Sequence, residues 1–203
     1  MENYPEGFTR WHAFNNSIEK IIIEDGITAI GDYSFYECES LKEVIIPESV
    51  TIIGEGAFKD CTDLTEIIIP DSGVTTIKPF AFCGCINKKN VVIFNNVTEI
   101  DDRVFDSCRI EEIIIPENIT KIGECAFYSC NLKKINIPKS VTDIGKYAFR
   151  DCDLMTEAII SEGVTTIGYG VFLLCTNLKK VVLPSTIEKI DDYALRLRKF
   201  GGY

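Results

Sequence analysis

Apolar residues recur along this chain with a period of about 23 residues. In the repeat that begins at Leu41, "LKEVIIPESVTIIGEGAFKDCTD", they fill positions one, four and six. This alternation, rich in Val and Ile, predicts a short strand with those three positions facing inward. A second apolar pair, Val50 and Ile53 in this repeat, predicts a very short extended segment on the far side of the coil. Proline cannot donate to a strand ladder, so it is expected to end the first strand in five repeats, at Pro47, Pro70, Pro116, Pro138 and Pro184.

A Phe-x-x-Cys pair closes seven of the repeats, and its cysteines lie 22 to 24 residues apart. The segment is too short for an independent α-helix, so it predicts one helical turn. A glycine shortly before the pair predicts a turn with positive φ. The seven pairs are Phe35 and Cys38, Phe58 and Cys61, Phe82 and Cys85, Phe105 and Cys108, Phe127 and Cys130, Phe149 and Cys152, and Phe172 and Cys175. The glycines are Gly31, Gly54, Gly123, Gly145 and Gly168.

The periodicity predicts a single solenoid domain. One coil cannot bury its own apolar side, whereas stacked coils bury equivalent residues in shared columns. We expect a β-rich solenoid of about eight coils of 22–24 residues, with a parallel sheet on one face and short extended or helical turns on the other. Residues 1–17 are expected to form an N-terminal cap, residues 18–195 the solenoid, and residues 196–203 a C-terminal tail. The coils begin at Ile18, Leu41, Leu64, Lys88, Ile110, Leu132, Leu154 and Leu178.

The repeat, L-x-x-I-x-I-P…V-T-x-I-G…A-F-x-x-C, resembles the BspA-like leucine-rich repeats, which are related to the treponemal type. The resemblance covers residues 18–195, with local departures such as Lys78 in place of the turn glycine and Leu195 in place of the last Phe. It implies a binding scaffold, because members of this family are mostly secreted or cell-surface proteins implicated in adhesion to host matrix proteins and other cells. It therefore also implies a cell-surface or secreted location, which the first 17 residues do not signal themselves, because they lack the apolar core of a signal peptide.

Charge and hydropathy exclude several classes of partner. The formal net charge is −10, and binding of nucleic acid or anionic membranes requires clustered Lys and Arg. Apolar runs are far shorter than the about 20 residues that span a bilayer, so we expect no membrane insertion.

Nine cysteines raise the alternatives of disulfides and a metal site. Stacked side chains point the same way, so we expect free buried thiols, with Cys83 and Cys125 as more accessible exceptions because they lie off the column. Cys83-x-Cys85 is the only close pair and His12 the only histidine, whereas zinc sites want four ligands at defined spacings. No nucleophile or phosphate-binding motif accompanies them. The sequence therefore predicts no metal, no cofactor, no catalytic residues and no enzyme activity.

Position five of each coil is the candidate interface, because it faces outward when positions four and six face inward. It is apolar and β-branched in seven of eight coils, which strand propensity alone can explain, but contiguous exposed apolar stripes also mark interaction sites. Charged residues border it at position three, among them Glu43, Glu112 and Lys134. The candidate residues are Ile22, Ile45, Ile68, Val92, Ile114, Asn136, Ile159 and Val182.

The expected partner is a protein or peptide, such as a component of the host extracellular matrix. The alternative function is a structural spacer or a self-associating module without a dedicated ligand. We expect a monomer, with weak end-to-end association as the alternative. A turn-side aromatic row is the second candidate surface, formed by Tyr33, Phe80, Tyr147 and Tyr193.

Overall fold

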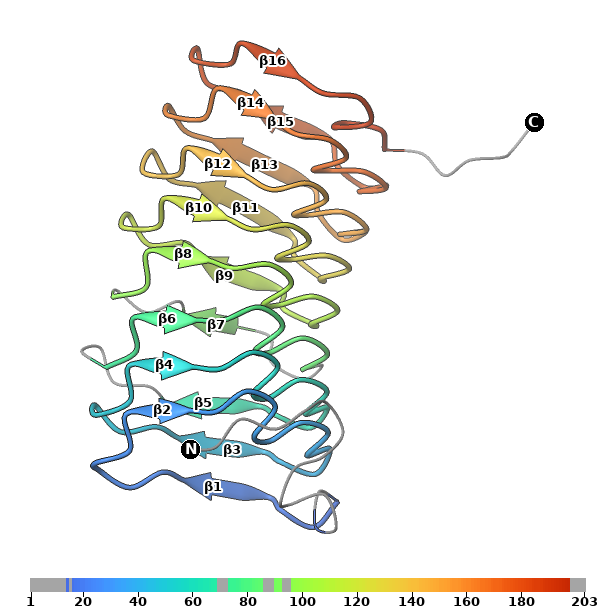
Figure 1. The fold of residues 1–203 in the computed structure, drawn as a ribbon. Helices are drawn as coiled ribbons and strands as arrows, with labels where there is room; N and C mark the ends of the chain where they lie inside the picture. The colour runs from blue at the N-terminus through green and yellow to red at the C-terminus, as the bar shows by residue number, and fades with distance from the viewer. Residues whose placement is uncertain (1–13, 15, 69–72, 86–89, 93–95, 198–203) are drawn as a thin grey trace.

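The computed structural model describes residues 14, 16–68, 73–85, 90–92 and 96–197, with the backbone alone at residues 68 and 90–92. Within these residues, sixteen strands of two to four residues alternate between two rows, one member of each row per coil. Figure 1 shows the coils stacked from β1 at one end to β16 at the other, with the even-numbered strands in front and the odd-numbered strands behind. The predicted parallel solenoid is thus confirmed.

The long-strand row contains β1 (Lys20–Ile22), β3 (Glu43–Ile45), β5 (Glu66–Ile68), β7 (Asn90–Val92), β9 (Glu112–Ile114), β11 (Lys134–Ile137), β13 (Glu157–Ile160) and β15 (Lys180–Val182). The short-strand row contains β2 (Ala29–Ile30), β4 (Ile52–Ile53), β6 (Thr76–Ile77), β8 (Glu99–Ile100), β10 (Lys121–Ile122), β12 (Asp143–Ile144), β14 (Thr166–Ile167) and β16 (Lys189–Ile190). All pairings are parallel and form the ladders β1-β3-β5, β7-β9 and β11-β13-β15 in the first row and β2-β4-β6, β8-β10-β12 and β14-β16 in the second.

The core lies between the two rows. In the second coil, Leu41, Val44 and Ile46 are almost completely buried, as the alternation predicts. Val50 and Ile53 approach them from the short-strand side and are also fully buried. The seventh coil differs from the prediction by one residue. Met155 is fully buried at position one whereas Leu154 is exposed, because the inserted residue is placed before the strand rather than after it.

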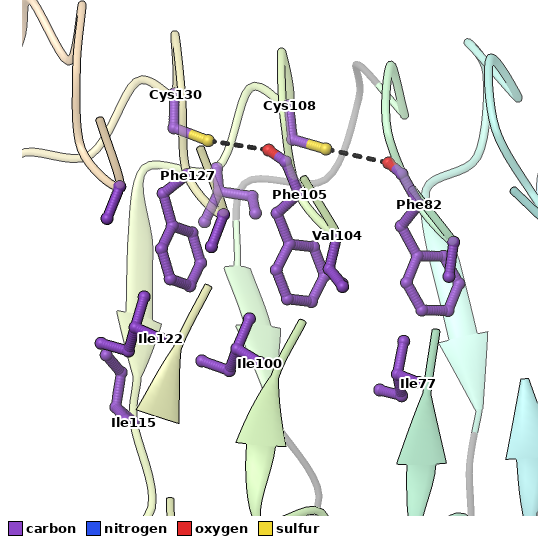
Figure 2. Close-up of a cluster of buried hydrophobic side chains, with 14 of the residues drawn as sticks. Ile77, Phe82, Ile100, Val104, Phe105, Cys108, Ile115, Ile122, Phe127 and Cys130 are labelled. Carbon is purple, nitrogen blue, oxygen red and sulfur yellow. Dashed lines mark hydrogen bonds between the residues drawn. The ribbon is translucent and has the colours of Figure 1, made fainter. Parts of the chain in front are cut away.

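The seven phenylalanines of the Phe-x-x-Cys pairs form one continuous column of stacked rings. Neighbouring ring centroids lie 5.3 to 5.9 Å apart and the ring planes are within 17° of parallel. Figure 2 shows three of these rings, Phe82, Phe105 and Phe127, one per coil. Every ring is at least 95% buried, so each fills the space between its two neighbours.

The cysteines explain why Phe and Cys keep a fixed separation. Each thiol donates to the backbone carbonyl of the phenylalanine in the preceding coil, for example Cys108 to Phe82 and Cys130 to Phe105, both at 3.1 Å (Figure 2). The same bond recurs at Cys61, Cys85, Cys152 and Cys175, at 3.0 to 3.2 Å. The column thus bonds each coil to the one before it.

All nine cysteines lie in the described residues and all are free thiols, as predicted. Cys83 is half-buried, which agrees with its expected accessibility. The expectation for Cys125 is wrong, because this residue is only 3% exposed. It lies two residues before Phe127 on a tightly turning backbone, where its amide donates to Lys146 of the next coil.

The Phe-x-x-Cys segment is a run of hydrogen-bonded turns and contains no continuous helix. Alternate amides donate to the next coil, such as Phe127 N to Ala148 O at 2.8 Å, while the amides between them close turns within the coil. Two residues in each turn run adopt positive φ, usually without glycine: in the first coil these are Tyr33 (52°) and Glu37 (53°).

The predicted positive φ at the turn glycines is therefore wrong. None of Gly31, Gly54, Gly123, Gly145 and Gly168 has positive φ. At Gly54 the reason for glycine is a close approach between coils, since a Cβ atom there would lie 2.6 Å from the backbone nitrogen of Asp32. The same holds at Gly145, where a Cβ atom would lie 2.5 Å from the nitrogen of Glu124.

Candidate functional site

The position-five residues lie in register along the outer face of the long-strand row, and we call this column the outer stripe. Strand pairing aligns Ile22 with Ile45 and Ile68, Val92 with Ile114, and Asn136 with Ile159 and Val182. The pairing of equivalent positions follows from the constant number of residues per coil.

The described side chains of the outer stripe are all at least partly exposed. Ile114 is 77% exposed, Ile22 63% and Val182 38%, and Asn136 is also exposed. Ile45 and Ile159 are half-buried between their cross-strand neighbours. The side chains of Ile68 and Val92 lie outside the described residues.

Ion pairs between neighbouring coils border the outer stripe at position three. Lys20 pairs with Glu43 at 2.9 Å. Glu157 lies between Lys180 at 2.7 Å and Lys134 at 3.2 Å. Hydrogen bonds from these two ammonium groups, that of Lys180 first, lower the pKa of the Glu157 carboxyl. Exposed pairs of this kind stabilise a fold by about 0–1 kcal/mol, so their main consequence is a fixed, charged border.

The opposite outer face, along the short-strand row, has a different chemistry. In six successive strands of this row the outward side chain is polar: Thr76, Glu99, Lys121, Asp143, Thr166 and Lys189. The residue before each strand is an exposed threonine whose hydroxyl donates to the threonine carbonyl of the preceding coil. Thr51 to Thr28 and Thr120 to Thr98 are such bonds, both at 3.2 Å. The V-T of the repeat was the available signal for this ladder, but the sequence analysis did not use it.

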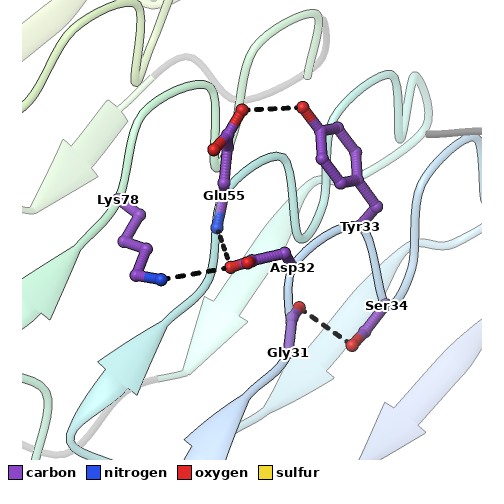
Figure 3. Close-up of polar contacts among 6 residues, drawn as sticks. All are labelled: Gly31, Asp32, Tyr33, Ser34, Glu55 and Lys78. Carbon is purple, nitrogen blue, oxygen red and sulfur yellow. Dashed lines mark hydrogen bonds and ion pairs between the residues drawn. The ribbon is translucent and has the colours of Figure 1, made fainter. Parts of the chain in front are cut away.

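The turn-side aromatic row packs against its own scaffold. Tyr33 donates to a carboxylate oxygen of Glu55 at 2.8 Å, and the backbone amide of Glu55 donates to Asp32 (Figure 3). A Cβ atom on Gly56 would lie 2.4 Å from the Tyr33 ring, so the ring covers this glycine of the next coil. Tyr147 covers Gly170 in the same way.

The remaining members are also in contact with neighbouring side chains. The guanidinium of Arg103 lies over Phe80 at 5.8 Å, and Tyr169 touches both Tyr147 and Tyr193 edge-on at 5.4 Å. These contacts give the row a structural explanation, so the outer stripe is the better candidate for binding.

The described residues contain no group of three or more side chains suited to hold a metal ion. Asp106 is a buried carboxylate, but it accepts bonds from Arg103 at 2.7 Å and from Ser107 at 2.8 Å. Burial, followed by the charges of Asp106 and Asp60, raises the pKa of the Cys83 thiol to about 12. Cys83 is therefore protonated at neutral pH and is a poor nucleophile. Within the described part of the chain, no helix is long and apolar enough to cross a membrane.

The stacked parallel coils with one column of phenylalanines define a leucine-rich repeat solenoid. The pattern of the BspA type leucine-rich repeat region matches in six copies, over residues 11–131 and 98–199. The chain belongs to this family. Comparison with curated protein sequences gave no match.

Solved bacterial structures agree with this assignment. The chain is similar to a leucine-rich cell surface protein of Faecalibacterium prausnitzii, with 26% identity and a TM-score of 0.68 over 87% of this chain. It is also similar to the leucine-rich repeat protein of T. pallidum, with 29% identity and a TM-score of 0.57 over 90% of this chain and 76% of that one. A leucine-rich repeat protein of Bacteroides ovatus shares the fold at 21% identity and a TM-score of 0.55, over 88% of this chain and 64% of that one. The chain spans 64% of the length of the Faecalibacterium protein.

Proposed function

We propose that this protein is a binding scaffold that docks a protein or peptide partner on the outer stripe. Repeat solenoids offer long, continuous surfaces for this purpose. The stripe has an apolar centre and a charged border, which is the usual anatomy of a protein interface.

The observation that carries the proposal is the difference between the two outer faces. Both consist of short parallel strands, so strand propensity favours β-branched residues on both. The short-strand face meets this preference with threonine and also carries charged residues, whereas the long-strand face places isoleucine or valine at seven of eight outward positions. Propensity alone does not require this difference, because Thr is also favoured in strands. Exposed apolar side chains in one aligned column suit a partner that covers them.

The proposed setting is the cell surface, with adhesion to other cells or to host matrix as the role. Two observations support it: the family is that of the BspA type repeat, and the similar Faecalibacterium protein is described as a cell surface protein. The acidic chain, with its net charge of −10, favours a partner segment that combines apolar side chains with basic ones.

The test is a double variant, Ile45→Glu with Ile114→Glu, measured for binding to immobilised extracellular matrix proteins. Two carboxylates in the stripe would have to lose water on docking without a partner charge, so binding should fall by at least about tenfold. The matched control is Thr76→Glu with Thr120→Glu, which places the same charges on the short-strand face and should leave binding unchanged. Circular dichroism establishes that both variants are folded. Equal affinity of the folded stripe variant and the wild type would contradict the proposal.

A further inference from the structure

The C-terminal end of the solenoid exposes core columns that are buried elsewhere. Ile190 is 47% exposed, whereas the equivalent Ile122 and Ile167 of inner coils are fully buried. Leu195 occupies the phenylalanine position and is 36% exposed. Terminal coils of solenoids normally present a polar outer side. The last described coil, residues 178–197, instead presents the same apolar positions that an inner coil offers to its neighbour.

The N-terminal end is open along its long-strand side. Among the described strands, β1 pairs only with β3, so its other edge has no strand beside it. An open cavity of about 490 Å³ adjoins this edge. The apolar residues that line it, among them Ile18, Ile21 and Ile27, are half-buried members of the same columns, and Glu24 and Asp25 lie at its rim.

The two ends carry opposite charge. Residues 18–40 contain six acidic side chains and one lysine. Residues 178–197 contain four basic side chains and three acidic ones, in a chain whose net charge is −10. Opposite potentials on two surfaces favour their association and disfavour contact between identical ends.

The columns also match position by position. If residues 18–40 continued the stack beyond residues 178–197, Ile21 would follow Val181, Ile30 would follow Ile190, and Phe35 would extend the ring column beyond Leu195. At position two, Glu19 would meet Lys179, which repeats the inner pair of Lys133 with Glu111 at 2.7 Å. One step after the phenylalanine, Arg196 would meet Tyr36, as the guanidinium of Arg150 meets Tyr128 at 5.5 Å in neighbouring inner coils.

We propose that the occupant of the exposed C-terminal end is the N-terminal end of a second copy of this chain, so that copies stack head to tail. The β1 strand of one copy extends the ladder that ends at β15 of the other. Such a contact joins unlike surfaces and leaves one free end of each kind, so it produces open chains of copies rather than a closed dimer. The contact is one coil deep on each side, so it forms at high protein concentration and weakens in salt.

Sedimentation velocity of the full chain over a concentration series tests this directly. We expect the average mass to rise with concentration at low salt and to fall back towards the monomer at about 1 M salt, where the Debye length is about 3 Å. A constant monomer mass at every concentration in low salt would overturn the proposal.

Two end variants establish the geometry. Ile190→Glu blocks the C-terminal end and Ile18→Lys blocks the N-terminal end, so each variant alone should remain monomeric. An equal mixture of the two keeps one intact end of each kind and should form a one-to-one dimer that does not grow further. Absence of this dimer, or association of either variant alone, would contradict head-to-tail stacking.

The exposed charges provide a version that leaves the core untouched if Ile18→Lys fails to fold. Lys179→Glu and Glu19→Lys should each weaken association alone and should restore it when mixed. Ile114→Glu, in the middle of the outer stripe, is the matched control and should associate like the wild type. Loss of association in this control would assign the contact to the outer stripe and overturn the proposal, whereas loss of matrix binding in the stripe variants concerns the proposed function alone.

Discussion

The two outer faces of this solenoid share a backbone geometry and differ in what their side chains do. On the short-strand face, threonine hydroxyls such as that of Thr120 bond to the carbonyl of the coil before, so the exposed side chains hold the stack together. On the long-strand face, Ile114 is 77% exposed and donates no hydrogen bond, so its side chain adds little to cohesion between coils. The difference separates a face that stabilises the fold from a face that is available to a partner. Coil five, residues 110–131, contains a member of each set and a buried phenylalanine, which allows all three to be compared at one level of the stack.

The largest effect is expected inside coil five, beneath both faces. Phe127→Ala removes a fully buried ring that stacks on Phe105 and Phe149 at about 5.5 Å. It should lower the free energy of unfolding by about 3–5 kcal/mol, as for other buried phenylalanines. Urea denaturation followed by circular dichroism measures this. A loss below about 1 kcal/mol would show that the ring column does not form the common core of the two faces.

Alkaline pH should act on the same core through the thiols. Burial raises the pKa of Cys38 from 9.0 to about 11, and burial is also the first cause of the raised pKa of Cys152. The folded state thus holds protons that the unfolded state releases near pH 9, so this contribution to stability is complete below pH 9 and is lost as pH rises towards the folded pKa values. The melting temperature should fall between pH 8 and pH 11. The double variant Cys130→Ala with Cys152→Ala should lose less over this range than the wild type, and an equal loss would contradict the thiol origin.

The smallest effect concerns the comparison itself. Thr120→Val keeps the shape and strand preference but removes the donor to Thr98, which should cost about 0.5–1.5 kcal/mol of stability. Its matched control on the other face, Ile114→Thr, should change stability by no more than about 0.5 kcal/mol, as surface substitutions usually do. Urea denaturation of both variants side by side measures the difference. Equal stability of the two would remove the distinction between a cohesive face and an available one.

The repeat period and the inward positions could be predicted because alternation in a strand leaves one arrangement that buries Leu41, Val44 and Ile46 together. The turn glycines could not be assigned correctly from sequence, since a glycine required for close approach looks the same as one required for positive φ. Gly54 is of the first kind, whereas Tyr33 takes positive φ without being glycine. Cys125 was misplaced because its burial depends on the course of the turn backbone. Binding by the outer stripe stays a prediction, because the direction of Ile114 follows from register but its partner does not.

The thiol bonds have a consequence for how such proteins change in length over evolution. Each Cys-to-Phe bond, like that of Cys130 to Phe105, joins a coil only to its immediate neighbour. Duplication of a 22–24-residue gene segment would therefore insert a coil whose donors and acceptors already match those above and below it. Growth requires no compensating mutation elsewhere, so a lineage can lengthen its recognition surface in steps of one coil at almost no cost to the rest of the molecule.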